Sequence, residues 1–117
     1  MKKIYYLKTC DSCKRILKSI PLEGFELQEI KSKPVTPEQL NEMQVIAGDY
    51  ESLFSRRAKK YTAMGLKDQV LEETDYKQLI LSDYTFLKRP VVILDDSIYI
   101  GNSKKNVERL KEHLKVF

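Results

Sequence analysis

Two cysteines near the N-terminus, Cys10 and Cys13, have the spacing of a redox-active thiol pair. They follow a short β-prone run, Lys3–Leu7, and lead into a segment with helical periodicity. A Cys-x-x-Cys at such a strand-to-helix junction is typical of thiol redox chemistry. The unpaired N–H groups and the dipole of the first helical turn favour a thiolate, and this lowers the cysteine pKa. Because Lys8 and Lys14 add positive charge nearby, we predict that Cys10 is a nucleophile and that Cys13 resolves the adduct it forms.

The same pair has two less reactive interpretations. A structural disulfide is one, but closing so short a loop would constrain the unfolded chain very little. A zinc site is the other, and closed zinc sites need four ligands. The chain offers only these two cysteines and one histidine, His113, which we expect to be a solvated residue late in a terminal helix. We therefore favour redox chemistry over two inert thiols, and we predict no metal site.

Composition limits the class of protein. The 117 residues suit one compact domain, and the 42% hydrophobic and 32% charged residues are ordinary for a globular chain. The net charge of +4 comes without basic patches interleaved with aromatics, so we expect no direct nucleic-acid binding. No apolar run could cross a membrane, and the first apolar stretch ends at Lys8, too early for a signal peptide. We therefore predict a cytoplasmic protein, where a close pair of thiols is more often catalytic or redox-sensing than structural.

Strand and helix patterns occur at both ends of the chain. Lys3–Leu7 is expected to be a buried strand, the segment from Cys13 a helix that Pro21 ends, and Phe25–Ile30 a second strand. Such a β-α-β unit normally has parallel strands. At the other end, Pro90–Leu94 and Ile98–Ile100 are predicted to form a hairpin, which a final helix follows.

The middle of the chain, about residues 36–84, is predicted to be an all-helical insertion. Thr36 begins the first helix as its cap, with proline next and Gln39 reaching back. A second helix is expected over Tyr50–Met64, and a third over Asp75–Ser82 with Thr74 as its cap. The order β-α-β, helical insertion, β-β-α predicts an α/β, thioredoxin-like fold with a mixed sheet, as a single domain over residues 1–117.

Arg89 and Pro90, directly before the hairpin, form a second candidate site. Proline can simply mark the start of a strand. In thioredoxin-like folds, however, a cis-proline at this junction lies beside the reactive cysteine and shapes the surface on which substrate docks. Arginine beside a thiol would supply planar donors for an oxyanion or for the carboxylates of glutathione. Arg89 is the first candidate and Arg57, in the insertion, is the second; for each, the alternative is a plain surface residue.

Several segments together resemble the glutathione-linked arsenate reductase family (ArsC), which includes the redox-responsive transcription regulator Spx. The resemblance covers essentially the whole chain and rests on Tyr5 through the cysteine pair to Lys14-Arg15, on residues 33–40, on Ser55-Arg56-Arg57, and on residues 89–92 with Ile100-Gly101. It implies a thioredoxin-like fold, Cys10 as the reactive thiol, and Arg57 and Arg89 near it. It also implies no bound cofactor, with glutathione or glutaredoxin as the reductant.

The chain departs from the family pattern at two places. Members typically have Cys-x-x-Ser-Arg with one essential thiol, whereas this chain has Cys13 followed by Lys14. A third family arginine would fall near residues 100–102, where this chain has Asn102. The arginine of the insertion is within an alignment slip of both Arg56 and Arg57.

Two functions therefore stay open. One is a thiol oxidoreductase in which the Cys10 thiolate attacks an oxyanion or a disulfide, with Cys13 or glutathione resolving the adduct. Its catalytic residues would be Cys10, Cys13 and Arg89. Substrate contacts would come from Lys8, Lys14, Arg57 and Pro90. The alternative is a Spx-like redox sensor that binds RNA polymerase.

Overall fold

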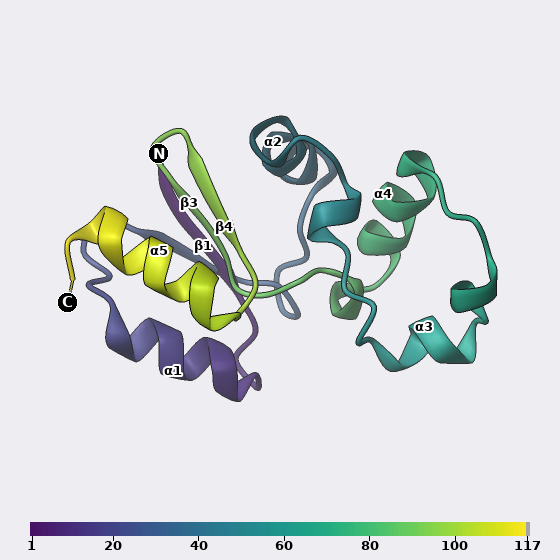
Figure 1. Ribbon diagram of the computed structural model, residues 1–117, viewed down its shortest axis with the longest axis horizontal. Coiled ribbons are helices and arrows are strands. Elements are labelled where there is room, and N and C mark those ends of the chain that lie inside the picture. Colours follow the sequence, from purple (N-terminus) through teal and green to yellow (C-terminus); the bar gives the residue numbers. More distant parts are fainter. Residues whose placement is uncertain (117) are drawn as a thin grey trace. The chain divides into compact units, whose positions relative to one another are not determined.

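The computed structural model describes residues 1–116 (Figure 1). Its contacts divide the chain into two compact units. The first, called here the sheet unit, comprises residues 1–33 and the segment from residue 89 onward; the second, the helical unit, is Pro34–Lys88. The helical unit covers the predicted insertion of residues 36–84. The organisation of residues 1–117 as a single domain stays a prediction.

The sheet unit is built on a four-stranded mixed sheet in the order β2-β1-β3-β4. Its strands are β1 (Lys2–Tyr6), β2 (Glu26–Glu29), β3 (Val91–Leu94) and β4 (Ser97–Ile100). β1 pairs in parallel with β2 and antiparallel with β3, and β3 and β4 form the hairpin. This confirms the predicted α/β fold, with β-α-β at the start and β-β-α at the end.

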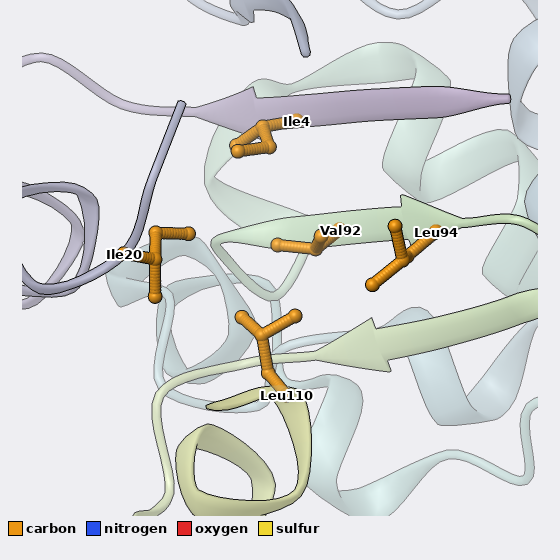
Figure 2. Packing of buried hydrophobic residues seen from close by; sticks show 5 residues of the cluster. All are labelled: Ile4, Ile20, Val92, Leu94 and Leu110. Atoms are coloured by element: carbon orange, nitrogen blue, oxygen red, sulfur yellow. The ribbon is translucent and has the colours of Figure 1, made fainter. Parts of the chain in front are cut away.

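One face of this sheet carries the core that Figure 2 shows. α1 (Asp11–Ser19) and α5 (Lys104–Leu114) lie on the same side of the sheet in Figure 1. Apolar residues from the strands, from the end of α1 and from α5 meet there, each less than a tenth exposed: Ile4, Ile20, Val92, Leu94 and Leu110. Burying such side chains is worth about 1.5–3 kcal/mol each, so this layer holds α1 and the cysteine loop before it against the sheet.

The helical unit contains α2 (Pro37–Ala47), α3 (Lys59–Ala63) and α4 (Glu73–Ser82) with three single-turn 3-10 segments. α2 begins with the predicted cap: the Thr36 hydroxyl accepts from the Gln39 N–H, and the Gln39 side chain accepts from the Thr36 N–H. α2 ends at Gly48, whose φ of 99° is the left-handed conformation that glycine adopts most easily. The start of this helix was therefore predicted correctly.

The prediction of one helix over Tyr50–Met64 is wrong. A 3-10 turn, Glu51–Leu53, is followed by an extended residue, Phe54, and only Lys59–Ala63 is α-helical. Phe54 pairs with Leu87 in an antiparallel bridge, and its fully buried ring lies 5.0–6.0 Å from the rings of three other aromatics: Tyr61, Tyr76 and Phe86. Tertiary packing of aromatic side chains thus overrides the local helical pattern.

One helix cap differs from the sequence prediction, and the second strand has an unusual burial pattern. The cap of α4 is Glu72 rather than Thr74, because the side chains of Glu72 and Asp75 each accept from the other residue's N–H. In β2, Leu27 is 43% exposed while Gln28 is buried and donates to the Lys33 carbonyl at 3.0 Å. The apolar residue is left outside because β2 is an edge strand. Among residues 1–116 no helix is both long and apolar enough to cross a bilayer.

Candidate functional site

The cysteine loop follows the end of β1, and the Arg89-Pro90 segment precedes the start of β3, so both lie at the same end of these two central strands. Because β1 and β3 are antiparallel and Tyr5 pairs with Val91, the end of β1 and the start of β3 are neighbours. After β1 the chain makes a turn in which the Cys10 N–H donates to the Leu7 carbonyl at 3.1 Å. Cys10 is then the residue that caps α1, and its carbonyl accepts from the Lys14 N–H at 3.0 Å.

The Cys10 thiol is free and half-buried. Burial on its own raises the pKa of Cys10. This effect is outweighed by hydrogen bonds from the Cys13 N–H and thiol, by the positive charge of Arg89 and by the Ser12 N–H, so the pKa of Cys10 lies below that of an ordinary cysteine. These are the N–H groups of the first turn of α1, which have no partner within the helix. The site therefore favours a thiolate at Cys10 that solvent can reach.

Cys13 has the opposite character. It is fully buried, and this burial raises its pKa to about 12, with further contributions from the hydrogen bond to Cys10 and from the Cys10 charge. The Leu7 backbone and the positive charge of Arg89 act in the other direction without reversing the shift. At neutral pH Cys13 is consequently a neutral thiol that donates a hydrogen bond to the Cys10 sulfur. The pair combines one activated and one protected sulfur.

The Arg89–Pro90 peptide bond is cis, which confirms the prediction for this junction. Pro90 is buried, and its carbonyl accepts from the Gly101 N–H at 2.9 Å, which continues the hairpin ladder by one residue. Arg89 is half-buried and its charge acts on both cysteine sulfurs. The structure thus brings together Cys10, Cys13, Arg89 and Pro90.

The remaining predicted residues are more peripheral or lie in the other unit. Lys8 and Lys14 flank the cysteine pair and are exposed, so both are accessible to an anionic ligand. Asn102, where the family resemblance predicts a third arginine, is exposed and brings no positive charge. Arg57 belongs to the helical unit, where it too is exposed.

The structure distinguishes Arg57 from its neighbour Arg56. The Arg56 guanidinium donates to the Glu51 carboxylate at 2.8 Å and to the Tyr76 hydroxyl at 3.1 Å, and it lies over the Tyr76 ring. The ion pair with Glu51 raises the pKa of Arg56. Arg56 is therefore a structural residue of the helical unit, which leaves Arg57 as the better candidate for a ligand contact.

Sequence reasoning missed one donor to the reactive sulfur and two partners of His113. The Ser12 N–H stabilises the Cys10 thiolate as expected of the first helical turn, whereas the part of the Cys13 thiol was not indicated by the sequence. His113 is exposed and lies late in α5, as predicted. In addition, its Nδ1 lies 2.7 Å from the Tyr99 hydroxyl and its Nε2 lies 3.5 Å from an Asp95 carboxylate oxygen. Within residues 1–116 no cluster of three or more ligating side chains could hold a metal.

A mixed sheet with a thiol pair between β1 and α1, beside a cis-proline, defines this as a protein of the thioredoxin-like class. The chain belongs to the ArsC family, whose model matches residues 5–110. This match confirms the family resemblance of the motifs. The comparison with curated proteins gave no match.

Solved structures of the same fold cover almost the whole chain. A Staphylococcus aureus protein studied by solution NMR is 26% identical, with a TM-score of 0.74 over 93% of this chain and 97% of its own. A possible arsenate reductase from Streptococcus mutans is 23% identical, with a TM-score of 0.73 over 95% and 98%. An arsenate reductase from Vibrio cholerae is 14% identical, with a TM-score of 0.74 over 99% and 97%. At these identities the last two comparisons concern the fold alone.

Proposed function

We propose that this ArsC-family protein is a cytoplasmic thiol oxidoreductase in which the Cys10 thiolate attacks an oxidised sulfur or an arsenic oxyanion. The observation that carries the proposal is the contrast between the two sulfurs. Cys10 is accessible with a lowered pKa, and Cys13 beside it is buried with a raised pKa.

The first step with a disulfide substrate is a displacement at sulfur. The Cys10 thiolate forms a bond to one substrate sulfur, the substrate disulfide breaks, and the second substrate sulfur leaves as a thiolate. Cys10 is thereby converted into a mixed disulfide and loses its negative charge. Its lowered pKa supports this step, because only the thiolate form is the nucleophile.

Loss of that charge prepares Cys13 for the second step. The Cys10 charge and the hydrogen bond to it are two of the causes that hold the pKa of Cys13 high, and both disappear in the mixed disulfide. The Cys13 thiol then gives up its proton more easily and attacks the Cys10 sulfur. A Cys10–Cys13 disulfide forms and the first substrate sulfur leaves as a thiolate. Glutathione or glutaredoxin is the proposed reductant that returns the pair to two thiols with two electrons.

An arsenic oxyanion would take the same first step at arsenic. The Cys10 thiolate displaces one oxygen, which leaves as water after protonation. Attack on the Cys10 sulfur by Cys13 or glutathione then releases arsenite, the arsenic gaining two electrons as the two sulfurs form a disulfide. The positive charge of Arg89 lowers the pKa of both sulfurs. We assign binding of the anionic substrate to Lys8, Lys14, Arg57 and the surface at Pro90.

The decisive experiment compares single cysteine variants in glutathione-dependent reduction of a mixed disulfide and of arsenate. Cys10→Ser should abolish turnover of the accepted substrate. Cys13→Ser should form the first adduct and accumulate it, which intact-mass measurement would detect as a stable addition to the protein. In the parent protein, alkylation at neutral pH should modify Cys10 alone, since Cys13 is buried and protonated.

Retained turnover in Cys10→Ser would refute the proposal. So would a Cys10 alkylation midpoint at or above that of a free thiol, about 8.5. Ser12→Ala is the matched control. It changes a side chain between the two cysteines but keeps the backbone N–H that acts on Cys10, so turnover should be close to that of the parent.

A redox sensor that binds RNA polymerase is the second candidate. It is favoured by the replacement of the third family arginine with the uncharged, exposed Asn102, which weakens the case for an oxyanion substrate. In that function the Cys10–Cys13 disulfide would change affinity for the partner without turnover. Capture of RNA polymerase by the oxidised protein and not by the reduced one, together with no reductase activity, would support this candidate over the first.

A further inference from the structure

We propose that Glu29 is a positioning residue for the reactive cysteine, a role that rests on the proposed function of Cys10. Sequence analysis placed Glu29 inside the second strand without any role. In the structure it is the last residue of β2 and pairs with Tyr6, the last residue of β1. Its carboxylate therefore lies at the sheet edge from which the cysteine loop departs.

The two oxygens of this carboxylate bind two different loops. Oε2 accepts from the Lys8 N–H at 2.9 Å, which lies in the turn that leads to Cys10. Oε1 accepts from both the N–H and the hydroxyl of Ser32, each at 2.8 Å, in the turn that follows β2. These hydrogen bonds hold the pKa of the Glu29 carboxyl below its usual range, beginning with the bond from Lys8.

Backbone hydrogen bonds on both sides of Glu29 restrain the position of its carboxylate. The Ile30 N–H donates to the Tyr6 carbonyl, and the Lys33 N–H donates to the Glu29 carbonyl, each at 2.9 Å. The start of the cysteine turn is thus attached to a well-ordered strand end through a single side chain. Hydrogen bonds to an ionised acceptor are stronger than neutral ones, so this attachment is a significant restraint on the turn.

The restraint reaches Cys10 within two residues. Lys8 lies in the turn that the hydrogen bond from the Cys10 N–H to the Leu7 carbonyl closes. The conformation of this turn determines where the Cys10 sulfur lies relative to the first turn of α1. The thiolate depends on that placement, because the N–H groups of Ser12 and Cys13 lower its pKa only when they point at the sulfur. In a more flexible turn, the Cys10 sulfur would accept hydrogen bonds from these N–H groups for a smaller fraction of the time.

Replacing Glu29 by alanine separates positioning from a simple charge effect. Removing a nearby negative charge would by itself favour the thiolate and lower the Cys10 pKa. Releasing the turn would do the reverse. We therefore expect Glu29→Ala to raise the pH midpoint of Cys10 alkylation by iodoacetamide. We also expect it to speed exchange of the Lys8 amide, measured by NMR, by about tenfold to a hundredfold, the range for losing one hydrogen bond to a charged group.

Glu26→Ala is the matched control. Glu26 is on the same strand and its carboxylate also accepts a hydrogen bond, but its partner is the Lys3 ammonium at 2.9 Å rather than the cysteine loop. This variant should leave both the alkylation midpoint and the Lys8 exchange rate at parental values. Glu29→Gln retains one carbonyl oxygen of the right reach, so it should fall between Glu29→Ala and the parent, and it serves if the alanine variant does not fold.

A Cys10 midpoint in Glu29→Ala that is unchanged or lower than that of the parent would overturn the positioning role, as would an unchanged Lys8 exchange rate. Failure of the proposed function has a different result. In that case the parent midpoint itself is unshifted, while the Lys8 exchange rate still reports whether Glu29 restrains the turn.

Discussion

The two units of this chain solve the same packing problem with different residues. The sheet unit buries an aliphatic layer contributed by strands and helices far apart in the sequence, including Ile4, Val92 and Leu110. The helical unit buries an aromatic group around Phe54. In the first, the hydrogen-bond ladder fixes which residues meet. In the second, α2 and α4 begin at capping boxes, while aromatic packing around Phe54 keeps the segment between them from forming one continuous helix.

The difference bears on function. The catalytic candidates Cys10, Cys13 and Arg89 are all on the sheet unit, attached to strand ends that the ladder holds in place. The predicted ligand contact Arg57 belongs to the helical unit. It is not among the groups described above that shift the pKa of the two cysteines. We therefore expect the chemistry to reside in the sheet unit.

Core truncation in each unit is expected to have the largest effect. Phe54→Ala should destabilise the protein by about 3–5 kcal/mol, and Ile4→Ala by about 2–5 kcal/mol, because each leaves a cavity in a fully buried site. Hydrogen exchange would be followed at Ile80 in the helical unit and at Ile93 in the sheet unit. We expect Phe54→Ala to affect Ile80 more, and Ile4→Ala to affect Ile93 more.

Chemical denaturation would give the total loss of stability for both variants. If each variant accelerated exchange at Ile80 and at Ile93 equally, the two units would be one cooperative structure, and the contrast drawn here would be wrong.

The carboxylate of Asp83 gives the helical unit a pH-dependent contribution. The Lys60 side chain and then Thr85 lower the pKa of Asp83 to about 2. A lowered carboxyl pKa stabilises the folded state above the ordinary value of about 3.9, and the contribution disappears as pH falls toward 2. Asp83→Asn should therefore cost about 1 kcal/mol at neutral pH, after allowance for solvent screening.

Thermal unfolding of Asp83→Asn and of the parent from pH 7 down to pH 2 would check this. The difference in stability should shrink below about pH 4 and nearly vanish near pH 2. A difference that stayed constant over this range would show that Asp83 acts through packing and not through its charge.

The two units also differ in how well the sequence predicted them. In the sheet unit the pattern of apolar residues fixes the strands, because β1 and β3 are buried and the turn residues bound them. The ends of all four predicted strands agree with the observed ones within one residue. In the helical unit, the capping box at Thr36 was also predicted, because all its partners lie within four residues.

What the sequence did not predict depends on contacts between distant residues. Phe54 is extended because Leu87 pairs with it and three aromatic rings surround it, and no local pattern indicates this. The anchoring role of Glu29 depends on Lys8, twenty-one residues away. For the site, residue types were enough to select Cys10, Cys13 and Arg89. The asymmetry between the two sulfurs required their burial to be known.

A smaller effect, on the reactivity of Cys10, should follow removal of the Arg89 guanidinium. Arg89→Ala should raise the midpoint of Cys10 alkylation, because a nearby positive charge stabilises the thiolate. Arg109→Ala is the control, since it removes the same charge from an exposed position on α5. A midpoint unaffected by Arg89→Ala would mean that backbone donors alone activate the thiol.

The smallest effect is expected at the buried end of the Lys3–Glu26 ion pair. Lys3 has a buried side chain and Glu26 an exposed one, so the pair gains little from a low dielectric while the lysine still bears a desolvation cost. Lys3→Met keeps the length and the apolar stem, and it removes that cost. We expect stability within about 0.5 kcal/mol of the parent in chemical denaturation. Lys3→Ala, which also loses the buried apolar stem, should be clearly less stable. Equal losses in both variants would instead make the ion pair itself a substantial contributor, and the sheet unit would then rely on charge as the helical unit does at Asp83.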